Sequence, residues 1–522
     1  MNNHLKIYFF LGLLVIGFLV LLGRLFELQI IFGTKNRALA EGNRVKREIL
    51  PAPRGMIYDR NGKELVRNVP IHRKLRMDNG EWIIISREEA LTLEARGETE
   101  NLRMDIGRDY LYGEALAHVL GYLGEVNEDE VKKGFFKPGD LVGRMGVEEQ
   151  YDLLLRGQDG GEVFEVDAQG NKIREIGKIE PISGKSLYLS IDAELSKIAY
   201  EALEKKPGAV VATEPQTGQV LVLVSSPSFN PNDINPQSLS DKSLPFFNRA
   251  ISGVYPPGST FKIVTSVAGL EEGKIDSQTT WNDTGEIRVG DYSYKNWYFT
   301  QYGKTEGTIN LVRAIQRSTD TFFYKVGEWV GPKKLAQWAE AFGLGRKTGI
   351  DLPGEVEGLV PSPGFLGNTY HFAIGQGDLL ATPLQINMMT EVIANNGRLC
   401  QPIVARSTSD GGPKGLLRGE INCQDLKLKQ TNIDLIKEGM KGVCSPGGTA
   451  FPFFEFQPQV ACKSGTAEFV NPQGKTHAWL TSFAPVDNPE IVATALLEGG
   501  GEGSYVAAPV VKKLMEAWFH GR

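Results

Sequence analysis

A turn rich in proline and glycine, leading into an apolar helix, constrains this chain more than any other stretch. The sequence Pro256-Pro257-Gly258 interrupts any preceding element, and apolar residues then recur at helical spacing from 261 to 268. Ser259 therefore falls in the first turn of the helix, and Lys262 follows one turn later on the same face. The pattern predicts an amine within reach of a hydroxyl at a helix N-terminus.

This pairing has a chemical use. Serine is a weak nucleophile near neutral pH and needs a base beside it, and lysine can be that base only when its pKa is lowered. A single Ser-x-x-Lys is also expected by chance in 522 residues. Here it occurs once and is followed by Ser318–Asp320 and Lys463–Thr466, in the order and type of the motifs that accompany it in one group of serine enzymes. The joint match favours nucleophilic catalysis at Ser259.

The second motif, Ser318-Thr319-Asp320, stands before an apolar helical face. We expect Ser318 to shuttle a proton between Lys262 and the leaving nitrogen. We expect Asp320 to orient Lys262 and a substrate amide. Taken alone, the motif is more typical of a serine-capped helix with a surface acid, so its functional interpretation depends on the other two motifs.

The third motif, Lys463-Ser464-Gly465-Thr466, lies on a predicted strand, where Lys463 and Gly465 point one way and Ser464 and Thr466 the other. Lys463 supplies positive charge for a terminal carboxylate, with the two hydroxyls beside it. Gly465 lets a substrate backbone approach the strand edge. The backbone N–H groups of Ser259 and Thr466 are the predicted oxyanion donors.

The chain begins with an unbroken apolar run, Ile7–Gly23, which at about 1.5 Å per residue nearly spans a bilayer core. No small-x-small cleavage pattern follows it, so residues 1–32 are predicted to be a cytoplasmic stub and an uncleaved transmembrane anchor rather than a signal peptide. Its orientation stays open, because Lys6 before the run is balanced by Arg24 and further basic residues after it.

Composition excludes some classes of function. The net charge of -6 and the lack of a basic run argue against nucleic-acid binding. The cysteines form no C-x-x-C pair, and no H-E-x-x-H occurs, so no metal and no cofactor are expected. Outside the cytoplasm one or two disulfides could form, and three full pairings are open among Cys400, Cys423, Cys444 and Cys462.

Two folded regions are expected after the anchor. Residues 47–185 carry turn signals such as Asn61-Gly62 but no catalytic constellation, so a supporting domain is predicted there. From residue 186 the order is a helix, two paired strands and the Ser259 helix. That order favours an α/β (α+β) domain over 186–522, with helices on an antiparallel sheet.

Together these features resemble a class B penicillin-binding protein, a membrane-anchored peptidoglycan D,D-transpeptidase. The resemblance covers nearly the whole chain: the anchor, the R-G-x-I-x-D-R-N-G segment at Arg54, the G-R-x-G-x-E segment at Gly143, and the three motifs. The aspartate at 320 resembles the elongation-type enzyme, penicillin-binding protein 2, more than the division-type one. The alternatives are a division-type enzyme, a β-lactamase or β-lactam sensor, and a non-catalytic scaffold.

The resemblance implies a serine β-lactamase-like transpeptidase domain, an elongated N-terminal pedestal domain of the dimerisation type, and one transmembrane helix. It implies a single-pass protein of the cell membrane with its catalytic domain outside the cytoplasm. The implied substrates are stem peptides and β-lactams, and the implied partner is a SEDS-type glycosyltransferase. Some members hold zinc between the first two motifs. Here Asp283 matches one ligand but no histidine or cysteine does, so zinc is doubtful.

Overall fold

The structure is a computed structural model of the chain. It describes residues 3–36, 44–78, 80, 82–99, 101–167, 172–362, 364–409, 422–469 and 473–521. The chain forms two compact units, one of residues 1–54 with 156–184 and one of residues 55–155 with 185–522. Each unit is described by itself below.

The first unit contains the N-terminal helix and a small sheet. Helix α1 (Asn3–Phe26) continues into a π-helical turn, η1 (Glu27–Ile31). Strands β1 (Val45–Leu50), β8 (Gly160–Val166) and β9 (Lys172–Ile179) form an antiparallel sheet in that order, with Val45 opposite Glu165 and Leu50 opposite Gly160. This sheet brings together segments that lie more than a hundred residues apart in sequence.

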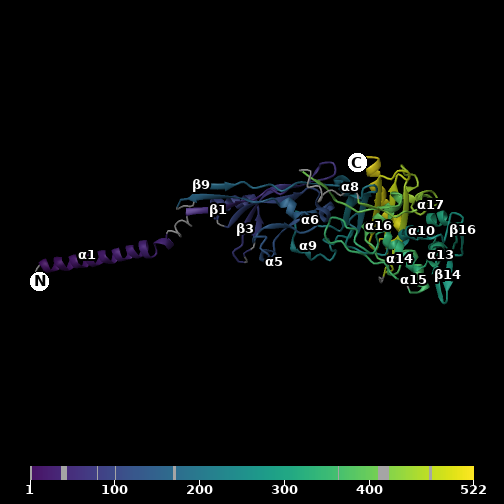
Figure 1. Ribbon diagram of the computed structural model, residues 1–522, viewed down its shortest axis with the longest axis horizontal. Helices are drawn as coiled ribbons and strands as arrows, with labels where there is room; N and C mark the ends of the chain where they lie inside the picture. Colours follow the sequence, from purple (N-terminus) through teal and green to yellow (C-terminus); the bar gives the residue numbers. More distant parts are fainter. Residues whose placement is uncertain are drawn as a thin grey trace. The chain divides into compact units, whose positions relative to one another are not determined.

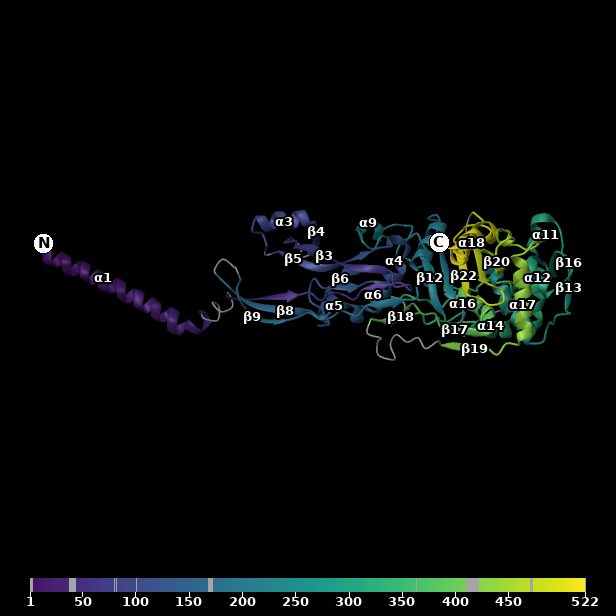
Figure 2. The ribbon, with the colours of Figure 1, turned by 90° about the horizontal axis from the view of Figure 1, so that it is seen from above.

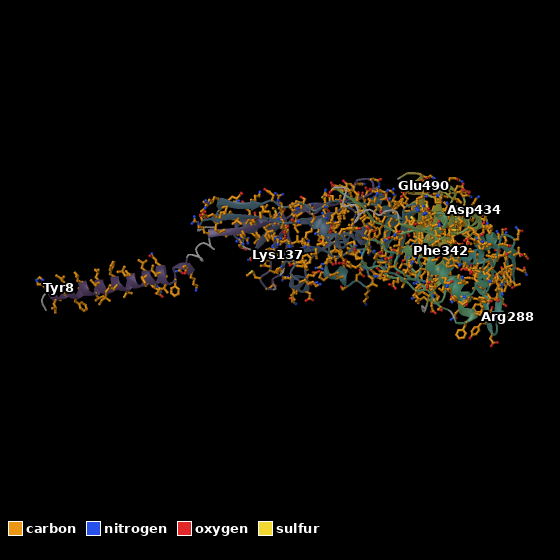
Figure 3. The ribbon with its side chains drawn as sticks, in the orientation of Figure 1. Tyr8, Lys137, Arg288, Phe342, Asp434 and Glu490 are labelled. Atoms are coloured by element: carbon orange, nitrogen blue, oxygen red, sulfur yellow. A yellow bond between two sulfur atoms is a disulfide. The ribbon has the colours of Figure 1, made fainter. Side chains whose placement is uncertain are left out.

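The span His4–Ile31 is long and apolar enough to cross a membrane. None of its most apolar window is buried in the described part of the chain, and Tyr8 lies exposed on the helix (Figure 3). Lipid, rather than a protein core, stabilises a helix that is apolar and exposed on all sides. The predicted anchor is therefore present as one continuous helix.

The second unit opens with a six-stranded sheet. Strands β18 (Ala405–Thr408), β10 (Leu187–Leu189), β2 (Ile57–Tyr58), β3 (Glu64–Leu75) and β4 (Trp82–Ile85) follow one another, and β5 (Leu102–Tyr110) also pairs with β3. Asp59 Oδ1 accepts hydrogen bonds from Asn61 N–H at 2.8 Å and Lys63 N–H at 2.9 Å, which closes the predicted Asn61-Gly62 turn. The sheet takes strands from both sides of residue 186, so the domain division there stays a prediction.

Short elements complete the part of this unit before residue 156. They are α3 (Arg87–Ala95), η2 (Gly113–Ala115), α4 (Ala117–Leu120), β6 (Leu123–Glu125), α5 (Glu128–Lys132), β7 (Leu141–Gly143), α6 (Gly146–Gln150) and α7 (Asp152–Arg156). The segment at Gly143 enters helix α6 as predicted, and Val147 and Glu148 are fully buried there. The ion pair of Glu148 with Arg108, at 2.8 Å, is equally buried. This family-like segment therefore serves the interior of the fold.

A five-stranded antiparallel sheet forms the centre of the second unit. Its order is β12 (Gln219–Ser226), β11 (Gly208–Glu214), β22 (Ile491–Leu497), β21 (Thr476–Ala484) and β20 (Ala461–Glu468). Helix α18 (Gly503–Phe519) packs on β20, β21 and β22 (Figure 2). Helix α8 (Ala193–Ala202) packs on β12. Helix α16 (Pro383–Ala394) packs on β11, β21 and β22. The predicted antiparallel sheet flanked by helices is confirmed.

A helical lobe lies beside this sheet. Helix α10 (Lys262–Glu271) packs against α13 (Asp320–Val330), α14 (Pro332–Ala341) and α17 (Gln430–Val443) (Figure 1). The other elements are α9 (Pro236–Leu239), η3 (Gly258–Phe261), β13 (Thr280–Asp283), β14 (Glu286–Val289), β15 (Tyr292–Lys295), α11 (Trp297–Tyr302), β16 (Gly307–Asn310), α12 (Leu311–Arg317), α15 (Leu366–Ala373), β17 (Arg398–Cys400), β19 (Cys423–Asp425) and η4 (Phe451–Phe453).

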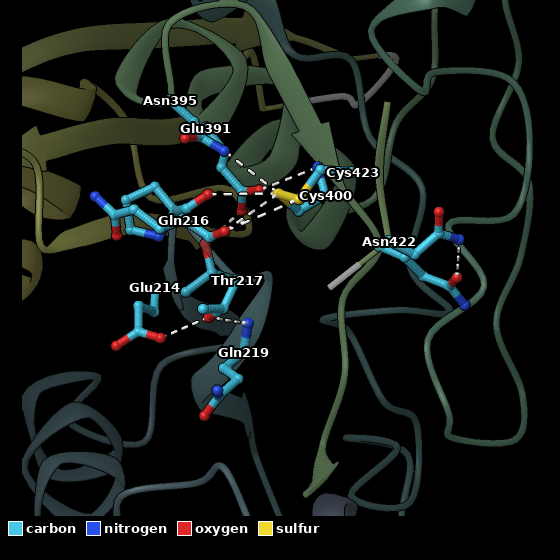
Figure 4. Close-up of a disulfide and its surroundings, with 12 residues drawn as sticks. Glu214, Gln216, Thr217, Gln219, Glu391, Asn395, Cys400, Asn422 and Cys423 are labelled. Atoms are coloured by element: carbon cyan, nitrogen blue, oxygen red, sulfur yellow. Dashed lines mark hydrogen bonds between the residues drawn. A yellow bond between two sulfur atoms is a disulfide. The ribbon is translucent and has the colours of Figure 1, made fainter. Parts of the chain in front are cut away.

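The four cysteines form two disulfides. Cys400–Cys423 joins the paired strands β17 and β19, close to the buried Glu391, whose carboxylate accepts the N–H of Cys400 at 3.3 Å (Figure 4). Cys444–Cys462 joins the end of α17 to β20, one residue before Lys463. Sequence left three pairings open because cysteine spacing alone does not report which side chains meet in space.

Candidate active site

Ser259 lies in the turn η3, directly before α10, as the sequence predicts. Gly258 has φ of 55°, and its N–H donates to Gly375 O at 2.8 Å. A Cβ on Gly258 would lie 3.0 Å from Thr466 O, so only glycine lets the turn approach strand β20 this closely. Ser259 itself is half-buried, and in the described part of the chain its hydroxyl has no hydrogen-bond partner.

Lys262 is the first residue of α10 and is fully buried. Its Nζ donates to Asp320 Oδ1 at 2.6 Å, to Ser318 O at 2.8 Å and to Ser318 Oγ at 3.1 Å. Burial lowers the pKa of Lys262 below 10.5, and Asp320 opposes this shift without cancelling it. A neutral amine keeps two N–H donors, enough for Asp320 and Ser318 O, and its lone pair is then free for a hydroxyl proton.

Ser318 lies between two lysines. It ends α12 in the left-handed conformation, with φ of 56°, which is rare for a residue with a side chain. Its Oγ accepts from Lys262 Nζ at 3.1 Å and from Lys463 Nζ at 2.8 Å. When Lys262 is protonated and makes all three of its bonds, both lone pairs of the hydroxyl are occupied and its own proton is directed away from the two amines. This geometry suits the predicted proton shuttle.

Lys463 is also fully buried, and its Nζ donates to Ser318 Oγ at 2.8 Å and to Ser464 O at 3.0 Å. Burial and the neighbouring Lys262 hold the pKa of Lys463 well below its ordinary value. That Lys463 supplies positive charge for a substrate carboxylate stays a prediction. An incoming carboxylate would raise this pKa again, because an adjacent anion favours the protonated amine.

The remaining residues of the third motif differ in exposure. Ser464 Oγ is buried against Thr449 Oγ1 at 2.7 Å, whereas Thr466 is exposed at the site. A Cβ on Gly465 would lie 3.1 Å from Pro257 O and from Trp479 Cβ. Gly465 therefore lets the turn that carries Ser259 pack closely on the strand, a reason that the sequence did not reveal.

The structure brings all of the predicted site residues into one region, since Lys262, Ser318, Asp320 and Lys463 are joined by hydrogen bonds and η3 packs on β20. Sequence reasoning missed several neighbours. Gln376 Nε2 donates to Thr466 O at 3.4 Å, and Trp297 N–H donates to Asp320 Oδ2 at 3.0 Å. They reach the site from separate loops and helices, and no local pattern marks such residues.

No group of three or more His, Cys, Asp or Glu residues that could hold a metal ion is present among the residues described. Asp283, the residue that matches one ligand of the zinc-containing members, accepts four hydrogen bonds from donors of this chain: Thr321 Oγ1, Gly285 N, Asn296 Nδ2 and Glu306 N. Those four bonds fill the lone pairs that a metal would use.

Family models match two parts of the chain. Residues 208–516 match the penicillin binding protein transpeptidase domain, and residues 84–189 match the penicillin-binding protein dimerisation domain. The peptidoglycan D,D-transpeptidase MrdA of Acinetobacter baumannii is 34% identical to this chain over 98% of its length and 87% of the relative's.

Solved structures agree with these matches. A complex between penicillin-binding protein PBP2 and MreC from Helicobacter pylori is similar with a TM-score of 0.78 and 28% identity, covering 91% of this chain and 99% of that one. A peptidoglycan synthase complex, described as coordinating polymerization and crosslinking, is similar with a TM-score of 0.78 and 31% identity, covering 100% and 98% of the two chains.

Proposed function

The chain belongs to the penicillin-binding proteins, in the penicillin-binding protein 2 branch of the peptidoglycan D,D-transpeptidases, and on that premise we propose how its residues divide the reaction. As a member it is a serine acyltransferase that cross-links stem peptides during cell-wall elongation and is acylated by β-lactams. One observation supports this assignment of roles above all: Ser318 Oγ lies 3.1 Å from Lys262 Nζ and 2.8 Å from Lys463 Nζ, so it links the two amines.

Acylation begins at Ser259. Its Oγ attacks the carbonyl carbon between the two terminal D-alanines while its proton passes to the neutral amine of Lys262. The N–H groups of Ser259 and Thr466 stabilise the oxyanion that forms. The C–N bond then breaks, and the leaving nitrogen takes a proton from Ser318, which regains one from the protonated Lys262. D-Alanine leaves and Ser259 carries the acyl group.

Deacylation reverses these proton movements. An amine of a neighbouring stem peptide attacks the ester carbonyl and loses a proton through Ser318 and Lys262, and Ser259 Oγ leaves with a proton. A new amide bond joins the two stems. Because water would give a carboxylic acid instead, transfer depends on the acceptor amine reaching the ester before water does.

Lys463 receives the carboxylate of the terminal D-alanine, together with the hydroxyl of Thr466. Burial and Lys262 lower the pKa of Lys463 in the free protein, and the arriving anion raises it again, which favours the protonated amine that pairs with the carboxylate. Asp320 holds Lys262 through its Oδ1 at 2.6 Å and faces the substrate amide from the same helix end.

The experiment that tests this assignment labels the full-length chain with a fluorescent penicillin and identifies the modified residue. Ser259→Ala should abolish labelling while its thermal unfolding stays close to that of the wild type. A matched control is Ser252→Ala, since Ser252 lies in the same turn region and its hydroxyl donates only to Gly354 O, at 2.7 Å. Labelling that persists in folded Ser259→Ala protein would sink the assignment.

Partners and location belong to the same proposal. A membrane anchor and a transpeptidase domain on one chain fit an enzyme that works beside a membrane-embedded glycan polymerase, for which we propose the SEDS type. The peptidoglycan synthase complex to which the chain is similar is described as coordinating polymerization and crosslinking, which supports such a pairing. The two disulfides support a catalytic unit outside the cytoplasm, where thiols are oxidised. We place the protein in the cytoplasmic membrane with one span.

A further inference from the structure

The helix that carries Asp320 has an unusual N-terminus. Helix α13 begins at Asp320, and the residue before it, Thr319, makes no capping hydrogen bond. Thr319 is fully buried, and in the part of the chain that the structure describes its Oγ1 has no hydrogen-bond partner. The side chain that normally caps a helix is therefore not used here.

A distant residue does the capping instead. Asn296, which precedes α11, is fully buried, and its Oδ1 accepts the N–H of Asp320 at 3.2 Å. The next residue, Trp297, donates its N–H to Asp320 Oδ2 at 3.0 Å and its indole Nε1–H to Arg317 O at 2.9 Å. The dipeptide thus contacts Arg317, directly before Ser318, and both the backbone and the carboxylate of Asp320, two residues after it.

Asp283 fixes the orientation of the Asn296 amide. Asn296 Nδ2 donates to Asp283 Oδ2 at 3.0 Å, because the carboxylate can only accept. The amide oxygen is thereby turned toward Asp320 N–H, which can only donate. Asp283 is buried, and its Oδ1 accepts the hydroxyl of Thr321, the second residue of α13, at 2.8 Å. A carboxylate close to a helix N-terminus also interacts favourably with the helix dipole.

We propose that Asn296 and Asp283 are positioning residues for acylation: together they form a remote cap on α13 that holds the carboxylate of Asp320 on Lys262. The proposal rests on the proposed role of Lys262 as the base. It assigns a function in the reaction to residues that neither touch the substrate nor belong to the three motifs.

The charges around the pair let the effect be worked out. Lys262 is faced by Asp320 of α13 and by Lys463 of β20, and Tyr324 of α13 lies near Asp320. Beside Asp283, Glu306 is paired with Arg313 at 3.0 Å and Arg317 at 2.7 Å, so this cluster carries one net positive charge and adds no anion that could replace Asp320. Asp320 is thus the anion that supports the protonated form of Lys262.

The direction in which loss of the cap shifts the pKa of Lys262 follows from this arrangement. If the cap is lost and Asp320 moves away, Lys262 loses the partner that raises its pKa, and burial then lowers that pKa further. The acid limb of the acylation rate, which reports the deprotonation of Lys262, therefore shifts to lower pH. The plateau rate falls as well, by about tenfold, because a weaker and less well-placed base transfers the proton more slowly.

The test measures second-order acylation of the detergent-solubilised full-length chain by a fluorescent penicillin from pH 5 to 9. Asn296→Ala should show an acid limb at lower pH and also a lower plateau rate. The matched control is Asn310→Ala, which removes the capping hydrogen bond that Arg313 N–H donates to Asn310 Oδ1, 3.0 Å long, at the end of α12 away from Ser318. The control should lose thermal stability and keep the wild-type acid limb.

An exchange variant tests the pair directly. Asn296→Asp sets two carboxylates against each other and should be the most damaging change. Adding Asp283→Asn restores a donor to the pair and should recover part of the rate, although Glu306 N–H then lacks its acceptor. Because this exchange moves a negative charge closer to Lys262, its acid limb should lie at higher pH than that of Asn296→Ala.

Two outcomes would overturn the proposal: an acid limb of Asn296→Ala that coincides with the wild type, or equal losses in Asn296→Ala and Asn310→Ala. If Asn296→Ala does not fold, Thr321→Val decides, since it keeps the shape of residue 321 and removes one donor to Asp283. An unchanged rate and acid limb in Thr321→Val would then count against the cap. Wild-type acylation by folded Lys262→Arg protein would instead contradict Lys262 as the base.

Discussion

At the scale of single residues, Ser318 combines a strained backbone with a reactive side chain. Its φ of 56° disfavours any residue except glycine, by about 1 kcal/mol for a residue with a Cβ. Because glycine would fit this backbone better, the presence of serine here indicates a role for its hydroxyl. The same position directs the hydroxyl toward both Lys262 and Lys463.

Two substitutions separate these effects. Ser318→Gly should unfold at the same temperature as Ser318→Ala or at a higher one, because only glycine is relieved of the strain. The difference in unfolding free energy should be at most about 1 kcal/mol. Both variants lose the hydroxyl and should transfer acyl groups poorly. Thermal unfolding of the two variants side by side checks this, and an alanine variant clearly more stable than the glycine one would contradict it.

Lys262 gives a prediction with a pH dependence. Its pKa lies below 10.5 because the amine is buried, so a neutral amine becomes available at lower pH than for an ordinary lysine, and acylation should rise with pH through that lowered pKa. Lys262→Arg keeps the charge but cannot lose it, and should slow acylation by about a hundredfold or more.

The measurement is the acylation rate of folded Lys262→Arg protein across pH, with Lys427→Arg as control, since that side chain is 82% exposed. The control should match the wild type at every pH. A loss of less than about tenfold in Lys262→Arg would argue that another group is the base.

At the scale of elements, the two disulfides form a matched pair. They close loops of similar length, with sequence separations of 23 and 18, so chain entropy assigns each about 3 kcal/mol of stability. Cys444–Cys462 ends one residue before Lys463 on β20, whereas Cys400–Cys423 ties β17 to β19. Their contributions to stability should therefore be alike and their contributions to activity different.

Replacing Cys444 and Cys462 by alanine should lower the unfolding free energy by about 2–4 kcal/mol and also slow acylation, because strand β20 loses its tie to α17. Replacing Cys400 and Cys423 should lower stability by a similar amount and leave the acylation rate of the folded protein unchanged. Denaturant unfolding and penicillin acylation of both double variants check this. Equal acylation rates in the two would show that the tie to α17 does not position Lys463.

Sequence predicted elements where the pattern is local and failed where contacts are distant. The hairpin of β11 and β12 follows from two short apolar runs joined by a turn, and the helix at Lys262 follows from helical spacing; the structure confirms both. The parallel pairing of Leu187 with Ile57 could not be predicted, because no pattern in either segment names its partner. Asn296 was missed for the same reason, since its contact with Asp320 spans 24 residues and two loops.

At the scale of the whole molecule, sequence predicted the anchor but not its direction. Helix α1 has Arg24 in its last turn and no acidic residue in its first, and basic residues lie on both sides of the apolar run. Charge bias therefore does not choose an orientation. The disulfides do favour one, because both join residues of the catalytic unit and such bonds persist in oxidising compartments.

The last prediction tests that direction. A reporter enzyme that is active only after export, fused after Val45 in place of the rest of the chain, should be active, because the single span would carry everything beyond it out of the cytoplasm. A fluorescent reporter that matures only in the cytoplasm should stay dark at the same position and fluoresce when fused to the N-terminus. A matched fusion that lacks residues 3–31 should reverse the first result, since the span is then missing. Export-dependent activity that survives this deletion would show that residues 3–31 are not what carries the reporter across the membrane. Cytoplasmic fluorescence after Val45 would place the residues beyond it in the cytoplasm, where no stem peptides are cross-linked.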